Sequence, residues 1–350
     1  MDHTPPPASA PSAEATNANW AAAVWHQALA PHTAGLPAVI GLDEQGRRRT
    51  LNWPTLRQQA ASLALALQDM GLQSGDVVAL YLPHVPEVVV AMVACASMGV
   101  VCSHCHPLLE TAQVLDRWRG LRPKVLLGAD GLYWGGQPHD RAHTLHELRI
   151  ALPSLQQLVV WRTPYAAERV YGATDLGTLC ARDNTATQAW VPVAVPAQHP
   201  LWLEHRTTDD LTLPPQAVAH SHADTWHVQQ ATWCANTLRA SHAPDAQPER
   251  LYWAASPQAG LWPLALGGLV HGTTVVLYDG HPCGDVDEPD TERLWRQLAR
   301  QQASVCITGA GNDPGLPPAP WADALRHVRY LELSANGETL TAKNPAKTAL

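Results

Sequence analysis

The sequence predicts an α/β protein with two similar subdomains, each built on a mostly parallel sheet covered by helices. Three observations predict this fold class. Strand-like runs alternate with helix-like segments of roughly 10 to 15 residues, which is typical of parallel sheets. Helix-like segments stop at a glycine, such as Gly71 and Gly99, as helices do at the C′ position. The same alternation resumes after a Val-, Pro- and Ala-rich linker at residues 190–198.

The first half of the chain supplies the elements of the first subdomain. Apolar residues recur at helical spacing in residues 56–70, which predicts a long helix, and the apolar segment 88–98 predicts a second one. Short apolar runs bounded by turn residues predict strands. In chain order we expect a short helix from residue 20, a strand at 38–42, the two helices with a strand at 77–82 between them, a strand at 100–102, a helix at 112–121 and a strand at 124–127.

The second half repeats this order. Residues 200–203 and 217–219 predict two strands on either side of a polar loop. They are followed by expected strands at 251–254, 273–278, 304–308 and 329–333, with helices at 261–269 and 291–302. We therefore expect a Pro-, Ala- and Ser-rich disordered tail at 1–19, a first subdomain at 20–190 and a second at 191–350.

Composition excludes several classes of protein. The formal net charge of −8 and pI near 6.1 argue against nucleic-acid binding. No apolar run approaches the roughly 20 residues of a membrane span, so we expect no membrane association. Seven cysteines without a secretory signal indicate reduced thiols and a cytoplasmic protein. Any reaction that requires a lysine has only Lys124, Lys343 and Lys347 available.

Three stretches of the sequence resemble one family. LNWPTLRQQAASLALALQDMGLQSGDVVALYLPHVPEVVVAMVACASMGVV resembles the N-terminal part of acyl-CoA synthetases of the adenylate-forming superfamily. CSHCHPLLETAQVLDRWRGLRPKVLLGADGLYWGGQPHDR and LALGGLVHGTTVVLYDGHP are similar to the acetoacetyl-CoA synthetases within it. The resemblance covers roughly residues 36 to 340.

The resemblance implies a fold, cofactors and a substrate class. In that family a large N-terminal domain binds ATP with Mg²⁺ and a small carboxylic acid, and forms an acyl-adenylate. A C-terminal domain then rotates so that coenzyme A can attack. This chain would be truncated to about the first half of such an enzyme, so the resemblance implies ATP and Mg²⁺ as cofactors but no coenzyme A site in this fragment.

The family's phosphate-binding loop corresponds here to HPLWLEHRTTDDLTLPPQAVAHSH, residues 199–222. The match places Gln216 where the family has its loop lysine, and no glycine or lysine occurs in the loop. Adjacent carboxylates would repel a triphosphate unless Mg²⁺ lay between them. The cofactor-binding candidates are Thr207, Thr208, Asp209, Asp210, Gln216, His220 and His222.

Two further family segments are altered. A TTTGW-type segment is replaced by the residues from Ser256 to Ala259, and a GTSA-type segment by the residues from Ile307 to Ala310. The substrate-binding candidates are Trp253, Ser256, Gln258 and Thr308.

Three altered segments between intact structural elements predict a degenerate, truncated relative that does not complete acyl-CoA ligation. One alternative is an active or split ligase for acetoacetate or another short acid. Another is a non-catalytic binding or regulatory partner of a full-length synthetase, joined as a homo- or hetero-oligomer through an incomplete sheet edge.

Other groups of residues give weaker indications of a functional site. The run CSHCH at residues 102–106 packs four potential metal ligands into five residues, but it lacks a second pair at the usual spacing. We expect two cysteines packed in or beside a sheet, and we assign no metal ligand.

His220 and His222 could face one pocket from alternate strand positions, or one could pack while the other is exposed. Asp209 and Asp210 favour a turn. No GxSxG elbow or GxGxxG loop occurs, and we assign no catalytic residue.

Overall fold

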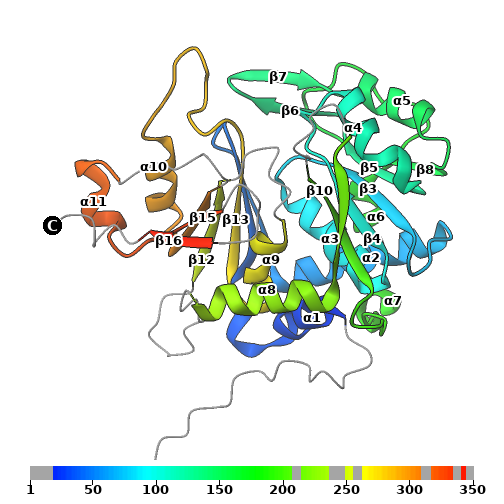
Figure 1. Cartoon of the computed structure of the whole chain (residues 1–350), viewed down its shortest axis with the longest axis horizontal. Helices are drawn as coiled ribbons and strands as arrows, with labels where there is room; N and C mark the ends of the chain where they lie inside the picture. Colours follow the sequence, from blue (N-terminus) through cyan, green and yellow to red (C-terminus); the bar gives the residue numbers. More distant parts are fainter. Residues whose placement is uncertain are drawn as a thin grey trace, which may run out of the picture.

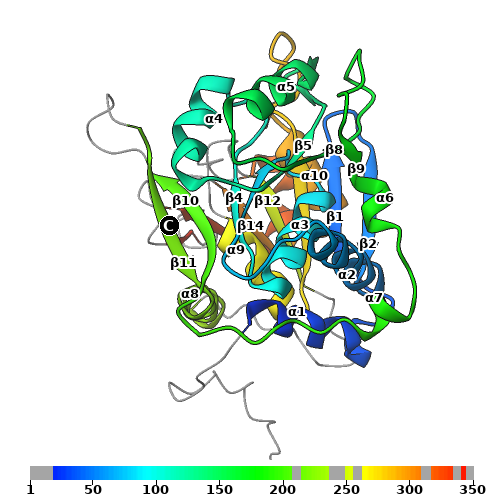
Figure 2. The same ribbon diagram turned by 90° about the vertical axis from the view of Figure 1, so that its right-hand side faces the viewer.

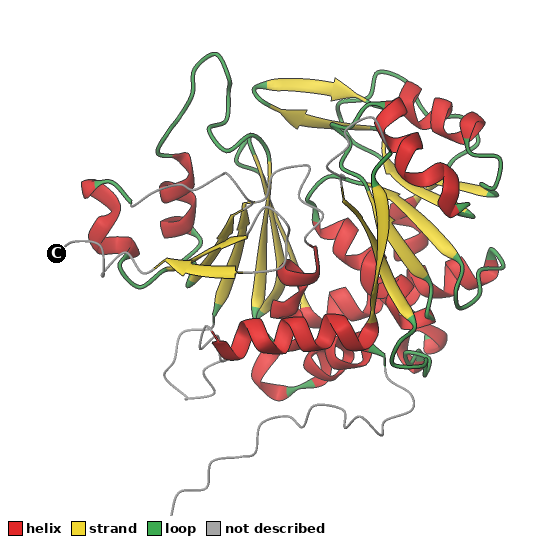
Figure 3. Cartoon of the chain, in the orientation of Figure 1, coloured by secondary structure: helices red, strands yellow, loops and turns green. Residues whose placement is uncertain are grey.

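The predicted fold class is confirmed by a computed structural model, which has mostly parallel sheets flanked by helices (Figures 1 and 3). It describes residues 19–206, 214–235, 249–254, 262–308, 317–333 and 340–343. The predicted tail at 1–19 lies outside these residues except for its last member. None of the described helices combines the length and apolarity that a membrane span needs.

Helices alternate with strands over most of the chain. The helices are α1 (Trp20–Leu29), α2 (Trp53–Asp69), α3 (Pro86–Met98), α4 (Thr111–Trp118), α5 (Ala142–Ala151), α6 (Leu176–Cys180), α7 (Thr185–Ala189), α8 (His222–Ala235), α9 (Trp262–Val270), α10 (Arg293–Arg300) and α11 (Ala319–Leu325), with short 3₁₀ turns at Pro31–Thr33 and Arg119–Leu121. The strands are β1 (Pro37–Asp43), β2 (Arg48–Asn52), β3 (Val77–Tyr81), β4 (Val101–His104), β5 (Val125–Ala129), β6 (Gly131–Trp134), β7 (Gln137–Asp140), β8 (Gln157–Trp161), β9 (Thr174–Asp175), β10 (Pro200–Arg206), β11 (Gln216–Ser221), β12 (Arg250–Ala254), β13 (Thr274–Asp279), β14 (Val305–Thr308), β15 (Arg329–Leu333) and β16 (Leu340–Lys343).

The described strands form two large sheets and one small hairpin. The first sheet has the order β11-β10-β4-β3-β5-β8-β9, and the second has the order β16-β15-β14-β12-β13-β1-β2. Within both sheets the central strands are parallel, while β11, β2 and β16 join antiparallel at the edges. The hairpin of β6 and β7 stands apart, near α4 and α5 (Figure 1). The expected pairing with partners through an incomplete sheet edge stays a prediction.

The two sheets do not divide the chain at residue 190. Strand β1 pairs with β13, so the start of the chain joins the second sheet. Strand β10 pairs with β4, so a later segment joins the first sheet. The linker expected at 190–198 therefore does not mark the boundary between the sheets.

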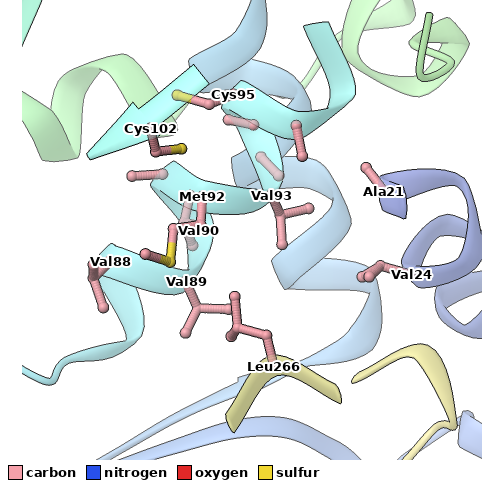
Figure 4. Close-up of a cluster of buried hydrophobic side chains, with 14 of the residues drawn as sticks. Ala21, Val24, Val88, Val89, Val90, Met92, Val93, Cys95, Cys102 and Leu266 are labelled. Carbon is pink, nitrogen blue, oxygen red and sulfur yellow. The ribbon is translucent and has the colours of Figure 1, made fainter. Parts of the chain in front are cut away.

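Helix α3 lies at the centre of the main hydrophobic core. Every residue of α3 except Glu87 is buried, which explains why its sequence is apolar on all sides. Its valines meet Leu266 of α9 and the side chains of Ala21 and Val24 of α1 (Figure 4). This core also includes Val78 of the first sheet and Val275 of the second, so it joins the two sheets.

Capping groups occur at both ends of α2 and at the C-terminal end of α3. Asn52 precedes α2, and its side chain accepts a hydrogen bond from the Thr55 N–H (2.8 Å). Gly71 follows the end of α2 with φ of 85°, and Gly99 ends α3 with φ of 70°. Both glycines take the left-handed conformation expected from the sequence. Helices α1 and α8 cross the end of the molecule opposite α4 and α5, as two perpendicular views show (Figures 1 and 2).

Candidate functional site

The carboxyl ends of the parallel strands define the functional edge of both sheets. Ligands of open α/β sheets bind outside these ends. Strands β10, β12 and β14 each end where one of the three altered segments begins. Ala254 and Thr308 are register partners, so β12 and β14 end side by side. The described ends of these strands thus lie at the edge where open α/β sheets generally bind ligands, and the predicted sites stay a prediction.

The structure describes part of the predicted residue set. Thr308 is buried at the end of β14, and the Trp253 backbone pairs with Ile307 and Leu277 in β12. The remaining candidates in these segments lie outside the described residues: Thr207, Thr208, Asp209, Asp210, Ser256 and Gln258.

The predicted strand, loop and strand around residue 210 is the hairpin of β10 and β11. Gln216 opens β11 opposite Arg206, and its side chain is exposed. His220 lies further along β11, opposite Trp202. Gln216 and His220 therefore belong to one edge hairpin of the first sheet.

Glu204 pairs with two basic side chains of this hairpin. Its Oε2 lies 2.8 Å from His220 Nε2 and accepts hydrogen bonds from Arg206 Nη2 at 3.2 Å and Nε at 3.3 Å. Burial alone would raise the pKa of Glu204, but the hydrogen bonds from His220 and Arg206 outweigh it and lower the pKa below its usual value. The carboxylate therefore stays ionised at pH 7, and it holds the Arg206 guanidinium and the His220 ring close to itself.

His222 has a different environment from His220. It is the first residue of α8, and its Nδ1 accepts a hydrogen bond from the Trp20 N–H (2.9 Å). Burial, aided by the nearby His199, lowers the pKa of His222 to about 4. His222 is therefore neutral at pH 7, and it joins α8 to α1.

Lys124 is distant from this functional edge. Its Nζ lies 2.7 Å from Asp76 Oδ2, just before β5 and β3 begin. It therefore belongs to the amino ends of the parallel strands, whereas ligands bind at the carboxyl ends. Lys343 lies on β16, and Lys347 falls outside the described residues.

A buried polar cluster that the sequence analysis did not identify lies between the sheets. It contains His84, which follows β3, His106, which follows β4, and Asp279, which ends β13. His106 Nε2 lies 3.4 Å from Asp279 Oδ1, and the backbone N–H of His84 donates to the same oxygen at 3.3 Å. The two imidazole rings are 5.0 Å apart. Burial, together with His106 and His104, lowers the pKa of His84 well below its usual value.

Glu44 and Trp134 close one side of the buried cluster. Glu44 accepts hydrogen bonds from the N–H groups of Gly135 (2.7 Å) and Gly136 (2.9 Å), and also from that of His281. These contacts tie the turn between β6 and β7 to the loop after β13. Trp134 at that turn presents an edge contact to His106, with 5.4 Å between the ring centroids.

A cavity of about 640 Å³ borders the cluster at Asp279. Aromatic and cationic side chains line it, as do residues at the start of α3. Arg47 pairs with Asp43 and lies 5.3 Å from the Tyr165 ring centroid, and Arg49 pairs with Glu87 and lies 5.5 Å from that of Trp161. The charges of Arg47 and Arg49 are thus partly neutralised by acidic neighbours.

The two large sheets, with their carboxyl edges facing one region, give the chain the fold of the N-terminal domain of an adenylate-forming enzyme. Residues 25–193 match the family described as AMP-binding enzyme.

Similar proteins are acyl-CoA synthetases. The chain is 28% identical over 275 residues to an acetyl-coenzyme A synthetase of Deinococcus radiodurans, covering 77% of this chain and 40% of that protein. It is 28% identical over 267 residues to an acetoacetyl-coenzyme A synthetase of Rhizobium meliloti (74% and 38%). The solved structure of acetoacetyl-CoA synthetase from Streptomyces lividans matches with a TM-score of 0.75 and 29% identity, covering 94% of this chain and 54% of that one.

These similarities confirm the resemblance to the N-terminal part of acetoacetyl-CoA and related acyl-CoA synthetases. The chain spans about 40% of the length of the curated relatives and 54% of the solved synthetase chain.

Proposed function

We propose that this AMP-binding, acyl-CoA synthetase-like chain does not by itself carry out ATP-dependent ligation of an acid to coenzyme A. The observation that carries the proposal is the charge arrangement of the β10–β11 hairpin. Exposed Gln216 stands where the resemblance places the loop lysine, and Glu204 holds Arg206 and His220.

The chemistry of a phosphate site explains why these residues matter. A triphosphate is held by backbone N–H groups that glycines leave accessible, and by an ammonium or guanidinium charge. The described hairpin residues supply a neutral amide, Gln216, and a carboxylate that is hydrogen-bonded to Arg206 and His220. They do not fit a triphosphate, and at close range Glu204 repels it.

The reaction to test is adenylation, because it precedes any step with coenzyme A in the family. The assay is exchange of labelled pyrophosphate into ATP with Mg²⁺ and acetate or acetoacetate, with a full-length acetoacetyl-CoA synthetase as the positive control. We expect no exchange above the protein-free rate. Exchange by the unaltered chain would support the alternative of an active or split ligase.

Calorimetric titration with Mg·ATP separates loss of chemistry from loss of binding. We expect no saturable heat from the folded chain. Saturable binding without exchange would contradict the charge argument, since it would mean that the hairpin still accepts the triphosphate.

Paired variants test the hairpin directly. Gln216→Lys alone is expected to restore no ATP binding, because Glu204 remains beside the site. Gln216→Lys combined with Glu204→Gln adds a positive charge and removes a negative one. Measurable ATP binding by the double variant, and none by the single one, would identify Glu204 as a determinant of the loss.

A further inference from the structure

We propose that His84, His106 and Asp279 bind one divalent transition-metal ion, for which Zn²⁺ is the best fit. The three residues come from turns or strand ends of both sheets, and none is more than 6% exposed. One ligand atom from each can be chosen so that all three lie within 4.8 Å of one another. This site is separate from the hairpin considered for ATP and does not depend on the proposed loss of ligation.

The spacing is close to that of a tetrahedral site. With metal–ligand distances of about 2.1 Å, ligand atoms of a tetrahedral Zn²⁺ lie about 3.4 Å apart. His106 Nε2 and Asp279 Oδ1 are already separated by 3.4 Å. The remaining separations, up to 4.8 Å, require the ligand atoms to move inward by about 1 Å or less.

The ligand chemistry selects the class of ion. Two imidazoles and one carboxylate suit Zn²⁺ and its first-row neighbours, whereas Mg²⁺ and Ca²⁺ prefer oxygen ligands throughout. Three protein ligands leave a fourth position for water, as in open zinc sites. Of the three residues, Asp279 also lines the 640 Å³ cavity, so the proposed site adjoins a space that can hold water.

Binding also requires a change at His106. The Leu108 N–H now donates to His106 Nδ1 at 3.2 Å, so Nε2 carries the proton that faces Asp279. An ion at Nε2 needs that nitrogen without a proton; the ring proton then lies on Nδ1, and the contact with Leu108 opens. The loss is that of one long hydrogen bond in a turn, which is small beside the binding energy of a structural Zn²⁺.

Zinc affinity is the quantity to measure. Chelator-treated folded protein is titrated with Zn²⁺ against a chromophoric chelator, and the stoichiometry is checked by elemental analysis after dialysis. We expect one tight equivalent, distinct from weak binding by the other histidines and cysteines. Absence of a tight equivalent in the unaltered protein overturns the proposal.

Three variants locate the ion. His106→Asn and Asp279→Asn each remove a ligand, and each is expected to weaken binding by roughly 100-fold or more. The matched control is His143→Ala, whose imidazole is 84% exposed on α5, and it should leave the affinity unchanged. Equal affinity in the first two variants, or an equal loss in the control, contradicts the assignment.

A cobalt experiment keeps the test independent of how the variants fold. Co²⁺ added to the unaltered chain should give the intense visible absorption of a four-coordinate ion with nitrogen and oxygen ligands. Near-ultraviolet circular dichroism of the tryptophans checks that each variant is folded. A spectrum with only the weak bands of six-coordinate aqueous Co²⁺ overturns the proposed geometry.

Discussion

Glu204 illustrates how one residue changes the charge that a β-hairpin presents to a ligand. Without it, the β10–β11 hairpin would present Arg206 and His220 to a ligand. With it, both groups are within 3.3 Å of one carboxylate oxygen. The sequence revealed the missing lysine, but it did not reveal these contacts, because residues 204 and 220 meet only through strand pairing.

The lowered pKa of Glu204 predicts a pH-dependent contribution to stability. A carboxyl group with a lower pKa in the folded state stabilises the fold above its ordinary value of 4.5, and this contribution is lost as the pH falls through the folded-state pKa. Glu204→Gln should therefore lower the free energy of unfolding at pH 7, and the difference from wild type should shrink below pH 4.5. Urea unfolding at pH 7 and at low pH measures it; a difference that grows on acidification contradicts the assignment.

Trp118 shows how the chain fills its core without phenylalanine, of which the sequence has none. The side chain is fully buried, makes an edge contact with Tyr81 and donates from Nε1 to Ser103 Oγ at 2.9 Å. Trp118→Ala should lower the free energy of unfolding by about 3–5 kcal/mol. Tyr171→Ala is the control, because Tyr171 is 94% exposed, and its effect should stay within about 0.5 kcal/mol. Similar values for both variants would contradict the assigned burial.

At the scale of elements, the end of α3 depends on a glycine for two reasons. Gly99 has φ of 70°, and a Cβ there would lie 2.6 Å from Ser74 Oγ and 2.8 Å from Val195 Cγ1. Gly71, which follows α2, has φ of 85° but open space around a Cβ. The two sites thus share a conformation and differ in packing.

Alanine substitutions at Gly71 and Gly99 distinguish the cost of backbone strain from the cost of steric conflict. Gly71→Ala should lower the free energy of unfolding by about 1–2 kcal/mol, the cost of a left-handed alanine. Gly99→Ala should lower the free energy of unfolding by about 1–3 kcal/mol more than Gly71→Ala does, because its neighbours must move. Denaturant titrations of both variants measure the difference. Equal effects would mean that Ser74 and Val195 adjust without loss.

At the scale of the whole molecule, the two halves of the chain are joined because each half contributes strands to both sheets. The central core contains residues of both sheets together with α3 and α9. Residues 20–190 alone would keep β1 but lose its neighbour β13, and would keep β4 but lose β10. The interior surface of α3 that meets Leu266 would be exposed to water.

We therefore expect the fragment 20–190 not to fold into the structure that it has in the whole chain. The measurement is amide exchange of the purified fragment compared with the full chain, which should show lost protection in β1 and β4. Native-like protection in both strands would mean that the first sheet and its helices suffice.

The local sequence determined most of the helices and strands. Apolar periodicity placed α2, a continuous apolar segment placed α3, glycines marked the ends of both, and apolar runs placed β3, β5 and β13. These features depend on residues close together in the chain, so periodicity and capping chemistry are enough to predict them. The same holds for the two strands on either side of residue 210, whereas the placement of Gln216 at the loop lysine rests on the resemblance to acyl-CoA synthetases.

Tertiary structure alone decided which strands became neighbours and which polar groups met. No pattern in residues 37–43 indicates pairing with β13, because many apolar strands would satisfy the same hydrogen bonds. His84, His106 and Asp279 are separated by up to 195 residues, yet the ends of β3, β4 and β13 bring them together. Ligand geometry is a property of distances between atoms, and only the folded arrangement of both sheets fixes those distances.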